Sequence, residues 1–154
     1  MASNDGVRAR VALVKELPQV YEALVGLNSL TTEILGERLC ELVKLRASYL
    51  NGCAFCIDMH TREAIEMGED QRRLFTLAAW REAANHFTEA ERAALALVDE
   101  VTKLGEHGVS DEVYANAAEH YSDRQMAALI TAIGVINVFN RIGITTGMQP
   151  PNLR

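Results

Sequence analysis

The 154-residue sequence lacks the features that are typical of disulfide-rich, nucleic-acid-binding and β-sheet proteins. It contains three cysteines, no run of Lys or Arg, and no stretch of sustained apolar–polar alternation. Three cysteines do not make a structural disulfide framework. A net charge of −6 without clustered basic residues argues against a nucleic-acid-binding surface, so we expect no nucleic-acid partner. Because the alternating pattern of a half-buried strand is missing, the sequence predicts no β-sheet.

Targeting and membrane signals are also missing from the sequence. The N-terminal segment lacks an uninterrupted apolar core with a small-residue cleavage site, so we expect no signal peptide. The longest nearly apolar run, residues 126–139, contains Thr131 and Asn137 and is too short to span a bilayer. We therefore expect a cytoplasmic protein without a membrane partner. In that reducing compartment disulfides are uncommon unless they are transient and catalytic.

Apolar residues recur at helical spacing along most of the chain. Hydrophobic residues make up 49% of the sequence and charged residues 23%, which is typical of a soluble globular protein. The pattern predicts one compact all-α domain over residues 1–154, with about seven helices. We expect them at roughly residues 18–27, 32–49, 53–67, 70–84 and 88–105, with a short one from Ser110 and a long one from Ser122.

Capping residues mark several of these boundaries. Thr88 with Glu91 has the spacing of a capping box, and Ser122 with Gln125 has a similar spacing. Gly68 is placed to end the third helix. The last helix is apolar nearly all round over residues 127–139, so it is either central to the monomer or shared with a neighbouring copy. The pattern leaves a homo-oligomer and a wrapped central helix equally open.

The chemistry of the sequence is concentrated in SYLNGCAFCIDMHTREA, residues 48–64. On a helix, Cys53, Cys56 and His60 fall within an arc of about 60° on the apolar side. Cys56 and His60 are four residues apart, so the imidazole can act as the base for that thiol. Cys53 lies in the first turn if the helix begins at the Asn51-Gly52 turn, where free N–H groups favour a thiolate. The residues alone leave the attacking thiol undecided.

Two other interpretations of this stretch remain open. The Cys, Cys and His side chains supply three zinc ligand types, and one more ligand would complete a tetrahedral site. Alternatively, the three residues are buried packing residues, since cysteine is among the most buried residue types. Covalent haem attachment is excluded because Ile57 stands where that motif requires a histidine.

Glu41 lies on the helix before the Asn51-Gly52 turn and borders its apolar face. Two antiparallel helices joined by that turn would bring Glu41 against the cysteine helix, where it could pass protons through His60. The simpler alternative is an ion pair with Lys44 on a solvated edge, and the pattern alone favours that alternative.

The segment ELVKLRASYLNGCAFCIDMHTREAIEMGE resembles the core of the alkylhydroperoxidase AhpD-like, or carboxymuconolactone decarboxylase, family. Glu41, Cys53, Cys56 and His60 fill the pattern E-x11-C-x-x-C-x3-H, so the core motif spans residues 41–60. The similarity continues through LAAWREA, FTEAERAALALVDEVT and INVFNR. It covers most of residues 18–144.

The resemblance implies an all-helical fold, assembly as a homo-oligomer (commonly a trimer or hexamer) and thiol peroxidase chemistry on a hydroperoxide substrate. It implies that Cys56 attacks the hydroperoxide and that Cys53 resolves the sulfenic acid as a disulfide. His60 would be the base and Glu41 part of the proton relay. The redox-active Cys53–Cys56 disulfide would serve without another cofactor or a metal. A lipoyl-bearing or thioredoxin-like reductant would restore it.

Several residues depart from that pattern or have no role in it. Some peroxidase members carry a histidine where this chain has Phe55, and decarboxylase members generally lack the cysteine pair, which weighs against lactone decarboxylation. We interpret Cys40 as a packing residue. Further residues at helical spacing predict a structural hydrogen-bond network: Asn137, Asn140 and Arg141.

Overall fold

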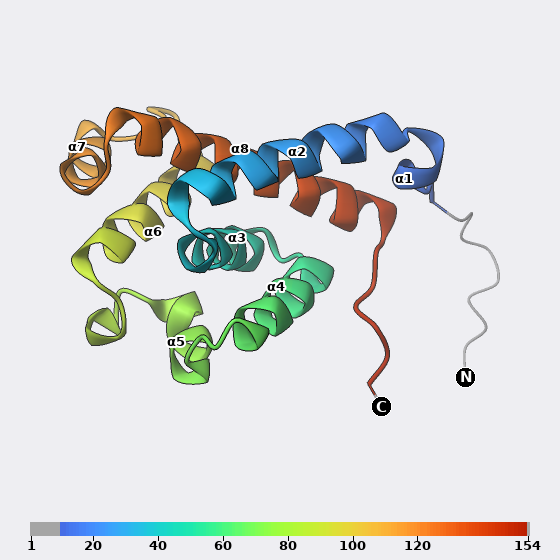
Figure 1. The fold of residues 1–154 in the computed structure, drawn as a ribbon, viewed down its shortest axis with the longest axis horizontal. Helices are drawn as coiled ribbons and strands as arrows, with labels where there is room; N and C mark the ends of the chain where they lie inside the picture. Colours follow the sequence, from blue (N-terminus) through green and yellow to red (C-terminus); the bar gives the residue numbers. More distant parts are fainter. Residues whose placement is uncertain (1–9, 154) are drawn as a thin grey trace.

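The computed structural model describes residues 10–153, and within that range it contains helices and no strand. Figure 1 shows the eight α-helices, which confirm the predicted all-α class. Two short 3-10 helices, Leu77–Ala79 and Ala84–His86, follow the fifth helix. The α-helices are α1 (Leu13–Glu16), α2 (Pro18–Leu35), α3 (Glu37–Asn51), α4 (Ala54–Glu66), α5 (Gln71–Thr76), α6 (Glu89–Thr102), α7 (Asp111–His120) and α8 (Asp123–Thr146).

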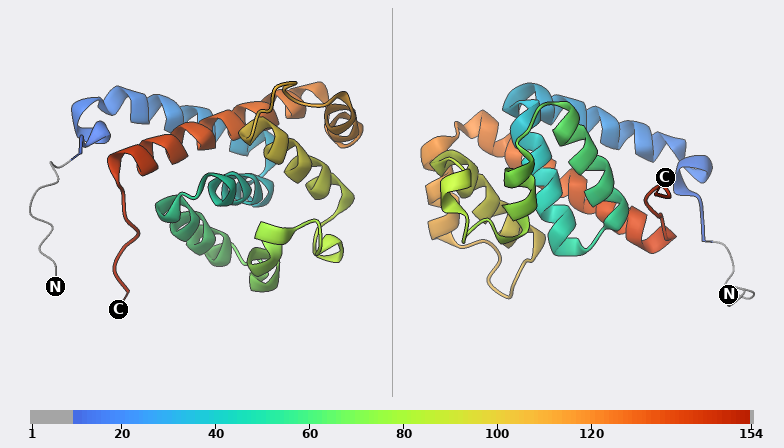
Figure 2. Two further views of the ribbon diagram at one scale, coloured as in Figure 1. Left: turned by 180° about the vertical axis from the view of Figure 1, so that it is seen from behind. Right: turned by 90° about the horizontal axis from the view of Figure 1, so that it is seen from below.

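Helices α3 and α8 are the centre of the packing. Helix α8 runs beside α2 and also contacts α3, α6 and α7, while α3 contacts α4 and α6 on its other sides (Figure 1 and Figure 2). The main apolar core lies between α3, α6 and α8 and includes Val43, Leu97, Leu129 and Ile133, all buried. Since each of these elements buries apolar side chains against the others, α3 is held firmly beneath α8.

The predicted break between the first two long helices is wrong. The chain stays helical through residues 28–32, and the break falls at Gly36, which has a φ of +86°. Ser29 and Thr31 look like loop residues, but their hydroxyls donate to backbone carbonyls of the preceding turn and so remain compatible with the helix. Gly36 provides the left-handed backbone that ends α2, because glycine adopts a positive φ without steric cost.

Other boundaries agree better with the sequence. Both predicted capping boxes are present, at Thr88 with Glu91 and at Ser122 with Gln125. The fourth predicted helix is shorter than expected, because the regular α-helix ends at Thr76 and gives way to a 3-10 turn. Within that turn the carbonyl of Ala78 accepts a hydrogen bond from the Arg46 side chain at 2.7 Å.

Helix α8 is longer than the apolar run from which it was predicted. Its 24 residues are long and apolar enough to cross a membrane by length and composition, so the sequence argument that this segment is too short was wrong. In the fold 44% of its most apolar window is buried, and its contacts with α2, α3 and α6 make it a core helix. One such helix is weak evidence for a membrane span, because the core helices of globular proteins pass the same test.

Candidate active site

The turn between α3 and α4 brings the candidate residues together. Gly52 adopts the left-handed conformation (φ +70°, ψ 35°), and the Cys53 N–H donates to the Ser48 carbonyl at 3.0 Å. This is a helix ending of the Schellman type, which turns the chain sharply. Helix α4 therefore returns along α3, and the two helices pack against each other. Glu41, near the start of α3, thus lies opposite His60, at the middle of α4.

The two cysteines are joined as a disulfide, and their Cα atoms are 5.4 Å apart. Both side chains are buried, with Cys53 1% and Cys56 3% exposed, as their position on the apolar side predicted. Cys53 is the N-cap of α4 rather than a residue of its first turn, and Cys56 is the third residue of the helix. The free N–H groups of the first turn are therefore close to Cys56 as well, so helix position no longer favours Cys53.

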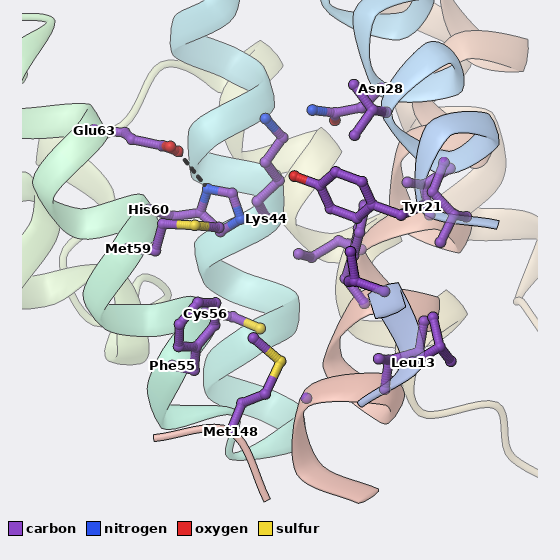
Figure 3. A pocket seen from close by; sticks show the side chains of 18 residues that line it. Leu13, Tyr21, Asn28, Lys44, Phe55, Cys56, Met59, His60, Glu63 and Met148 are labelled. Carbon is purple, nitrogen blue, oxygen red and sulfur yellow. Dashed lines mark hydrogen bonds and ion pairs between the residues drawn. The ribbon is translucent and has the colours of Figure 1, made fainter. Parts of the chain in front are cut away.

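A cavity of about 500 Å³ opens beside this pair. Of the two cysteines, Cys56 lines it, together with His60 on the next turn of α4. Figure 3 shows Cys56, His60 and Met148 along one wall and Tyr21 and Leu13 on the other. Most of the other lining residues are apolar: Val14, Leu24, Val25, Phe55, Met59, Val135, Ile136, Phe139 and Ile142.

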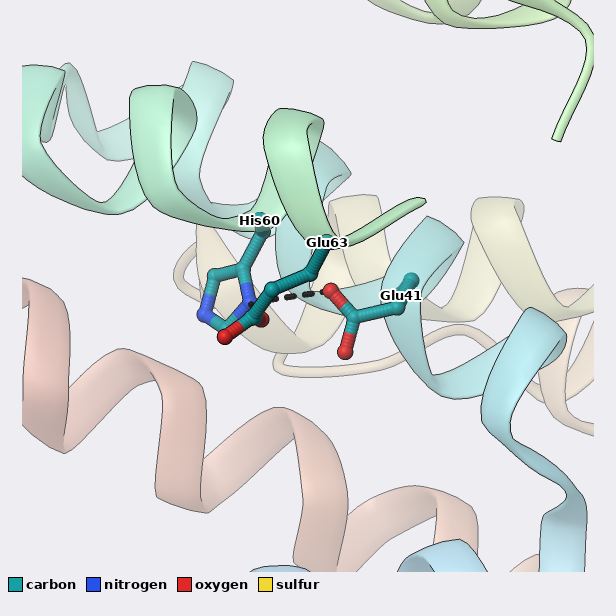
Figure 4. A group of neighbouring side chains, drawn as sticks. All are labelled: Glu41, His60 and Glu63. Atoms are coloured by element: carbon teal, nitrogen blue, oxygen red, sulfur yellow. Dashed lines mark hydrogen bonds and ion pairs between the residues drawn. The ribbon is translucent and has the colours of Figure 1, made fainter. Parts of the chain in front are cut away.

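His60 is held by two carboxylates. Its Nδ1 atom lies 2.9 Å from Glu41 Oε2 and 2.9 Å from Glu63 Oε2, and Figure 4 shows the two side chains converging on the ring. Ionised carboxylates only accept hydrogen bonds, so Nδ1 carries the hydrogen. The neutral ring then has its lone pair on Nε2 and can accept a proton there.

Glu41 is shared between His60 and Lys44. Its second oxygen, Oε1, lies 2.7 Å from Lys44 Nζ, and both side chains of this pair are buried. The ion pair proposed as the simpler alternative thus exists, but not on a solvated edge. Burial alone would raise the pKa of Glu41, but the hydrogen bond from His60 and the positive charges of the protonated His60 ring and of Lys44 outweigh burial and lower that pKa. Glu41 is therefore ionised at neutral pH.

Glu63 and Lys44 were not predicted as parts of the site. Glu63 follows His60 by three residues, a spacing at which helical side chains meet, so this contact could have been found from the sequence. Its side chain is 48% exposed, and it connects the buried imidazole to solvent. Lys44 was considered only as a surface partner of Glu41, and its position at the cavity depends on tertiary packing.

The same cluster contains donor atoms suited to a metal ion. One ligand atom each from Glu41, His60 and Glu63 lies within 4.8 Å of the others. This set shares only His60 with the Cys53, Cys56 and His60 combination that the sequence suggested as zinc ligands. Imidazole and carboxylate donors suit divalent transition metals, whereas the sulfurs are bonded to each other.

The remaining predicted residues are structural. Cys40 is a buried free thiol whose pKa is raised by burial, in agreement with a packing role. The predicted network is present: Asn140 donates to Ser48 Oγ at 3.0 Å, and Asn51 donates to the side-chain oxygens of Asn137 and Asn140. Arg141 also donates to the Asn137 side chain. These bonds join the C-terminal half of α8 to the end of α3, next to the cysteine turn.

Comparison with known proteins identifies the family of the chain. The family model described as "Carboxymuconolactone decarboxylase family" matches residues 18–100, which include all four residues of the core motif. The chain belongs to this family. It is 38% identical over 139 residues to the uncharacterized protein YdfG of Bacillus subtilis (strain 168), covering 90% of this chain and 94% of that protein.

Solved structures share the fold of this family member. A protein of unknown function from Agrobacterium tumefaciens, described as a candidate antioxidant defence protein AhpD, superposes with a TM-score of 0.87. The two chains are 37% identical, and the match covers 95% of this chain and all of the other. An uncharacterized peroxidase-related protein from Silicibacter sp. TM1040 has a TM-score of 0.72 at 18% identity, covering 90% of this chain and 81% of that one, and supports the fold alone.

Proposed function

We propose that this protein is a thiol-dependent peroxidase that reduces hydroperoxides through its cysteine pair. The observation that carries the proposal is the side-by-side placement of Cys56 and His60 on a cavity wall, with His60 Nδ1 held by an ionised Glu41. A buried base beside a thiol is the arrangement that activates a sulfur nucleophile. The description of the Agrobacterium relative as a candidate antioxidant protein supports the same function.

The reaction begins with the dithiol form. His60 Nε2 takes the proton of the Cys56 thiol, and the thiolate attacks the terminal oxygen of the hydroperoxide ROOH. The O–O bond breaks, RO⁻ takes the proton from His60 and leaves as ROH, and Cys56 becomes a sulfenic acid. The Cys53 thiol then gives up its proton and its sulfur attacks the Cys56 sulfur, which breaks the S–O bond; the displaced hydroxide takes up a proton and leaves as water. Two thiols are oxidised to the disulfide while ROOH is reduced to ROH and water.

The carboxylates keep the imidazole ready for this transfer. Glu41 holds the hydrogen on Nδ1 and stabilises the imidazolium that forms when Nε2 is protonated. Lys44 fixes the other oxygen of Glu41, so the carboxylate keeps its orientation. Glu63 connects the ring to solvent and gives the relay a route for proton exchange.

The cavity favours organic hydroperoxides over hydrogen peroxide. A volume of about 500 Å³ with mostly apolar walls is far larger than hydrogen peroxide needs, and it can bury an apolar group R. The expected reductant is a lipoyl-bearing or thioredoxin-like dithiol, and we propose a cytoplasmic homo-oligomer that needs no further cofactor.

Thiol titration under stopped flow tests the assignment. Wild-type dithiol protein mixed with excess hydroperoxide should lose two thiols per chain. Cys53→Ser should accumulate a Cys56 sulfenic acid that dimedone traps, whereas Cys56→Ser should react at least 100-fold more slowly, on the order expected when an activated nucleophile is lost. Cys40→Ser, which removes a thiol outside the pair, is the matched control and should retain the wild-type rate.

Two results would overturn the proposal. Thiol loss in Cys56→Ser at the wild-type rate would show that Cys56 is not the attacking residue. Decarboxylation of a cyclic acid that survives in a Cys53→Ala, Cys56→Ala double variant would show that the thiols are not needed, and would assign a lyase activity to His60 and Glu41 instead.

A further inference from the structure

The cavity beside the cysteines has one polar end. Most of its wall is apolar, but Lys44, Asn28 and Tyr21 also line it. Figure 3 shows the Lys44 ammonium, the Asn28 amide and the Tyr21 hydroxyl directed toward the same region, beside His60. Lys44 lies on α3, whereas Tyr21 and Asn28 are seven residues apart on α2 and share a face of that helix. The cavity therefore combines apolar walls with a group of hydrogen-bond donors from two helices.

Lys44 has hydrogen-bonding capacity that the protein does not use. Its side chain is only 9% exposed, and among residues 10–153 its ammonium donates to a single acceptor, Glu41 Oε1 at 2.7 Å. An ammonium carries three hydrogens, so two of them need acceptors from the cavity. A buried donor without an acceptor costs free energy. A molecule that displaces water from this end of the cavity must therefore offer Lys44 an acceptor, or its binding is weakened.

Asn28 and Tyr21 enlarge the group of donors. Asn28 accepts from Thr31 through its backbone carbonyl, but within residues 10–153 neither its side-chain amide nor the Tyr21 hydroxyl has a hydrogen-bond partner. The Tyr21 ring makes an edge contact with Phe139, with 6.2 Å between the ring centroids, which fixes the ring at the cavity wall. The amide nitrogen and the hydroxyl can both donate to an oxygen held by Lys44.

The charges around this end of the cavity favour an uncharged acceptor. Glu41 already balances the positive charge of Lys44, and Glu63, which lies 2.9 Å from His60 Nδ1, adds a negative charge. A carboxylate on the ligand would bring a further negative charge toward these two side chains in apolar surroundings, which is electrostatically unfavourable. A carbonyl or ester oxygen accepts the same hydrogen bonds without that cost.

We propose that Lys44, Asn28 and Tyr21 bind an uncharged oxygen of the substrate, so that the cavity selects apolar hydroperoxides that also carry a carbonyl or ester group. Cys56 and His60 lie one turn apart on α4, and the donor group lies beyond His60 (Figure 3). The hydroperoxide at Cys56 and the second oxygen are therefore separated by at least about 5 Å, the rise of one helical turn. The inference rests on the proposed function only in taking the occupant to be a hydroperoxide.

Binding of small aromatic probes tests the oxygen site without peroxide. Acetophenone and ethylbenzene have nearly the same shape, but only acetophenone carries an acceptor oxygen. Burial of apolar surface alone favours ethylbenzene, whereas donors left unpaired at Lys44 disfavour it. We expect oxidised wild-type protein to bind acetophenone at least threefold more tightly than ethylbenzene in NMR titrations, the size expected for one hydrogen bond. Benzoate, which carries a carboxylate, should bind at least threefold more weakly than acetophenone.

Removing the donors should remove this preference. Lys44→Met keeps a long side chain without the ammonium, so it should bind ethylbenzene at least as tightly as acetophenone. Asn28→Leu leaves the Lys44–Glu41 pair in place and should lower the preference for acetophenone at least twofold, so it decides the test if Lys44→Met does not fold. Asn116→Leu changes an exposed residue of α7 outside the cavity and is the matched control, with the wild-type preference expected.

The outcomes separate this inference from the peroxidase proposal. Ethylbenzene binding to wild type as tightly as acetophenone, or an unchanged preference for acetophenone in folded Lys44→Met or in Asn28→Leu, would overturn the oxygen site. Tighter binding of benzoate than of acetophenone would overturn the assignment of an uncharged ligand. Because the probes are not peroxides, a protein that shows these preferences but lacks peroxidase activity would refute the proposed function and leave the oxygen site intact. Peroxidase activity without the preferences would do the reverse.

Discussion

At the scale of single residues, Glu41 combines two roles that the sequence presented as alternatives. One carboxylate oxygen pairs with Lys44 and the other accepts from His60. The buried carboxylate is therefore fully hydrogen-bonded, which offsets the cost of removing its charge from water. Because both partners favour the ionised form, the proposed proton relay and the stability of the fold depend on the same charge.

Replacing Glu41 should change how stability depends on pH. Its pKa in the folded protein is lowered from an ordinary value of 4.5, so its contribution to the free energy of unfolding is present above that value and is lost as pH falls through the lower, folded pKa. Glu41→Gln should therefore be less stable than wild type at pH 7, and the difference should shrink below pH 4.5. Urea denaturation at several pH values checks this expectation. A destabilisation that is equal at pH 7 and at pH 3 would contradict it.

The sequence predicted this residue set only in part. The spacing of Cys53, Cys56 and His60 on one helical face follows from the 3.6-residue period alone, and all three residues are buried as expected. The contacts of Glu41 depend on how α3 and α4 cross after the Gly52 turn, which no local pattern contains. For that reason the residues alone favoured a solvated Glu41, and the family resemblance was needed to place it in the relay.

At the scale of secondary structure elements, helix boundaries were predicted correctly where a capping side chain bonds to the backbone of the same helical turn. The boxes at Thr88 and Ser122 are local and were predicted correctly. The break at Gly36 was missed because the first helix was predicted to end near residue 27, whereas the Ser29 and Thr31 hydroxyls donate to carbonyls of the preceding turn and the helix continues. Ser and Thr side chains can bond to the backbone either within a helix or in a loop. Helix boundaries near such residues therefore cannot be assigned from residue type alone.

Asn140 joins two elements around the site, so its loss should destabilise the whole fold. Its side chain is fully buried and bonds to Ser48 and Asn51, which lie on α3 next to the cysteine turn. Asn140→Ala should lower the free energy of unfolding by about 1–3 kcal/mol, because the Ser48 hydroxyl and the Asn51 amide each lose one hydrogen-bond partner. Urea denaturation measures the change, and the exposed Asn116→Ala on α7 should differ from wild type by less than about 0.5 kcal/mol. Equal stability of the two variants would show that the network carries no net stabilisation.

At the scale of the whole molecule, the helices that cover the site also carry exposed apolar side chains. On α2 these are Tyr21, Val25, Leu27 and Leu30, each at least 40% exposed. Tyr21 and Val25 line the cavity, whereas Leu27 and Leu30 lie on other sides of α2, and exposed apolar side chains of this kind are typical of an interface. They support the proposed homo-oligomer, and they lie on the helix that packs along α8.

Disrupting that surface should dissociate the assembly without damaging the site. Leu30 is 49% exposed and does not line the cavity, so Leu30→Glu should leave the fold intact and place a charge at the interface. Analytical ultracentrifugation at micromolar concentration should show an oligomer for wild type and for Asn116→Glu, and a smaller species for Leu30→Glu. A monomeric wild-type protein would remove the proposed oligomer.

The N-cap of α4 gives the proposed redox cycle a structural readout. In the disulfide form the Cys53 side chain makes no capping hydrogen bond, so the N–H groups at the start of the helix lack a side-chain acceptor. A thiolate released at this position would accept from those groups, much as Ser or Asp does at other helix starts. Reduction and helix capping are then thermodynamically linked. Amide hydrogen exchange in the first turn of α4 would slow when the protein is reduced. The exchange rate would therefore report whether the two cysteines form a disulfide or are free.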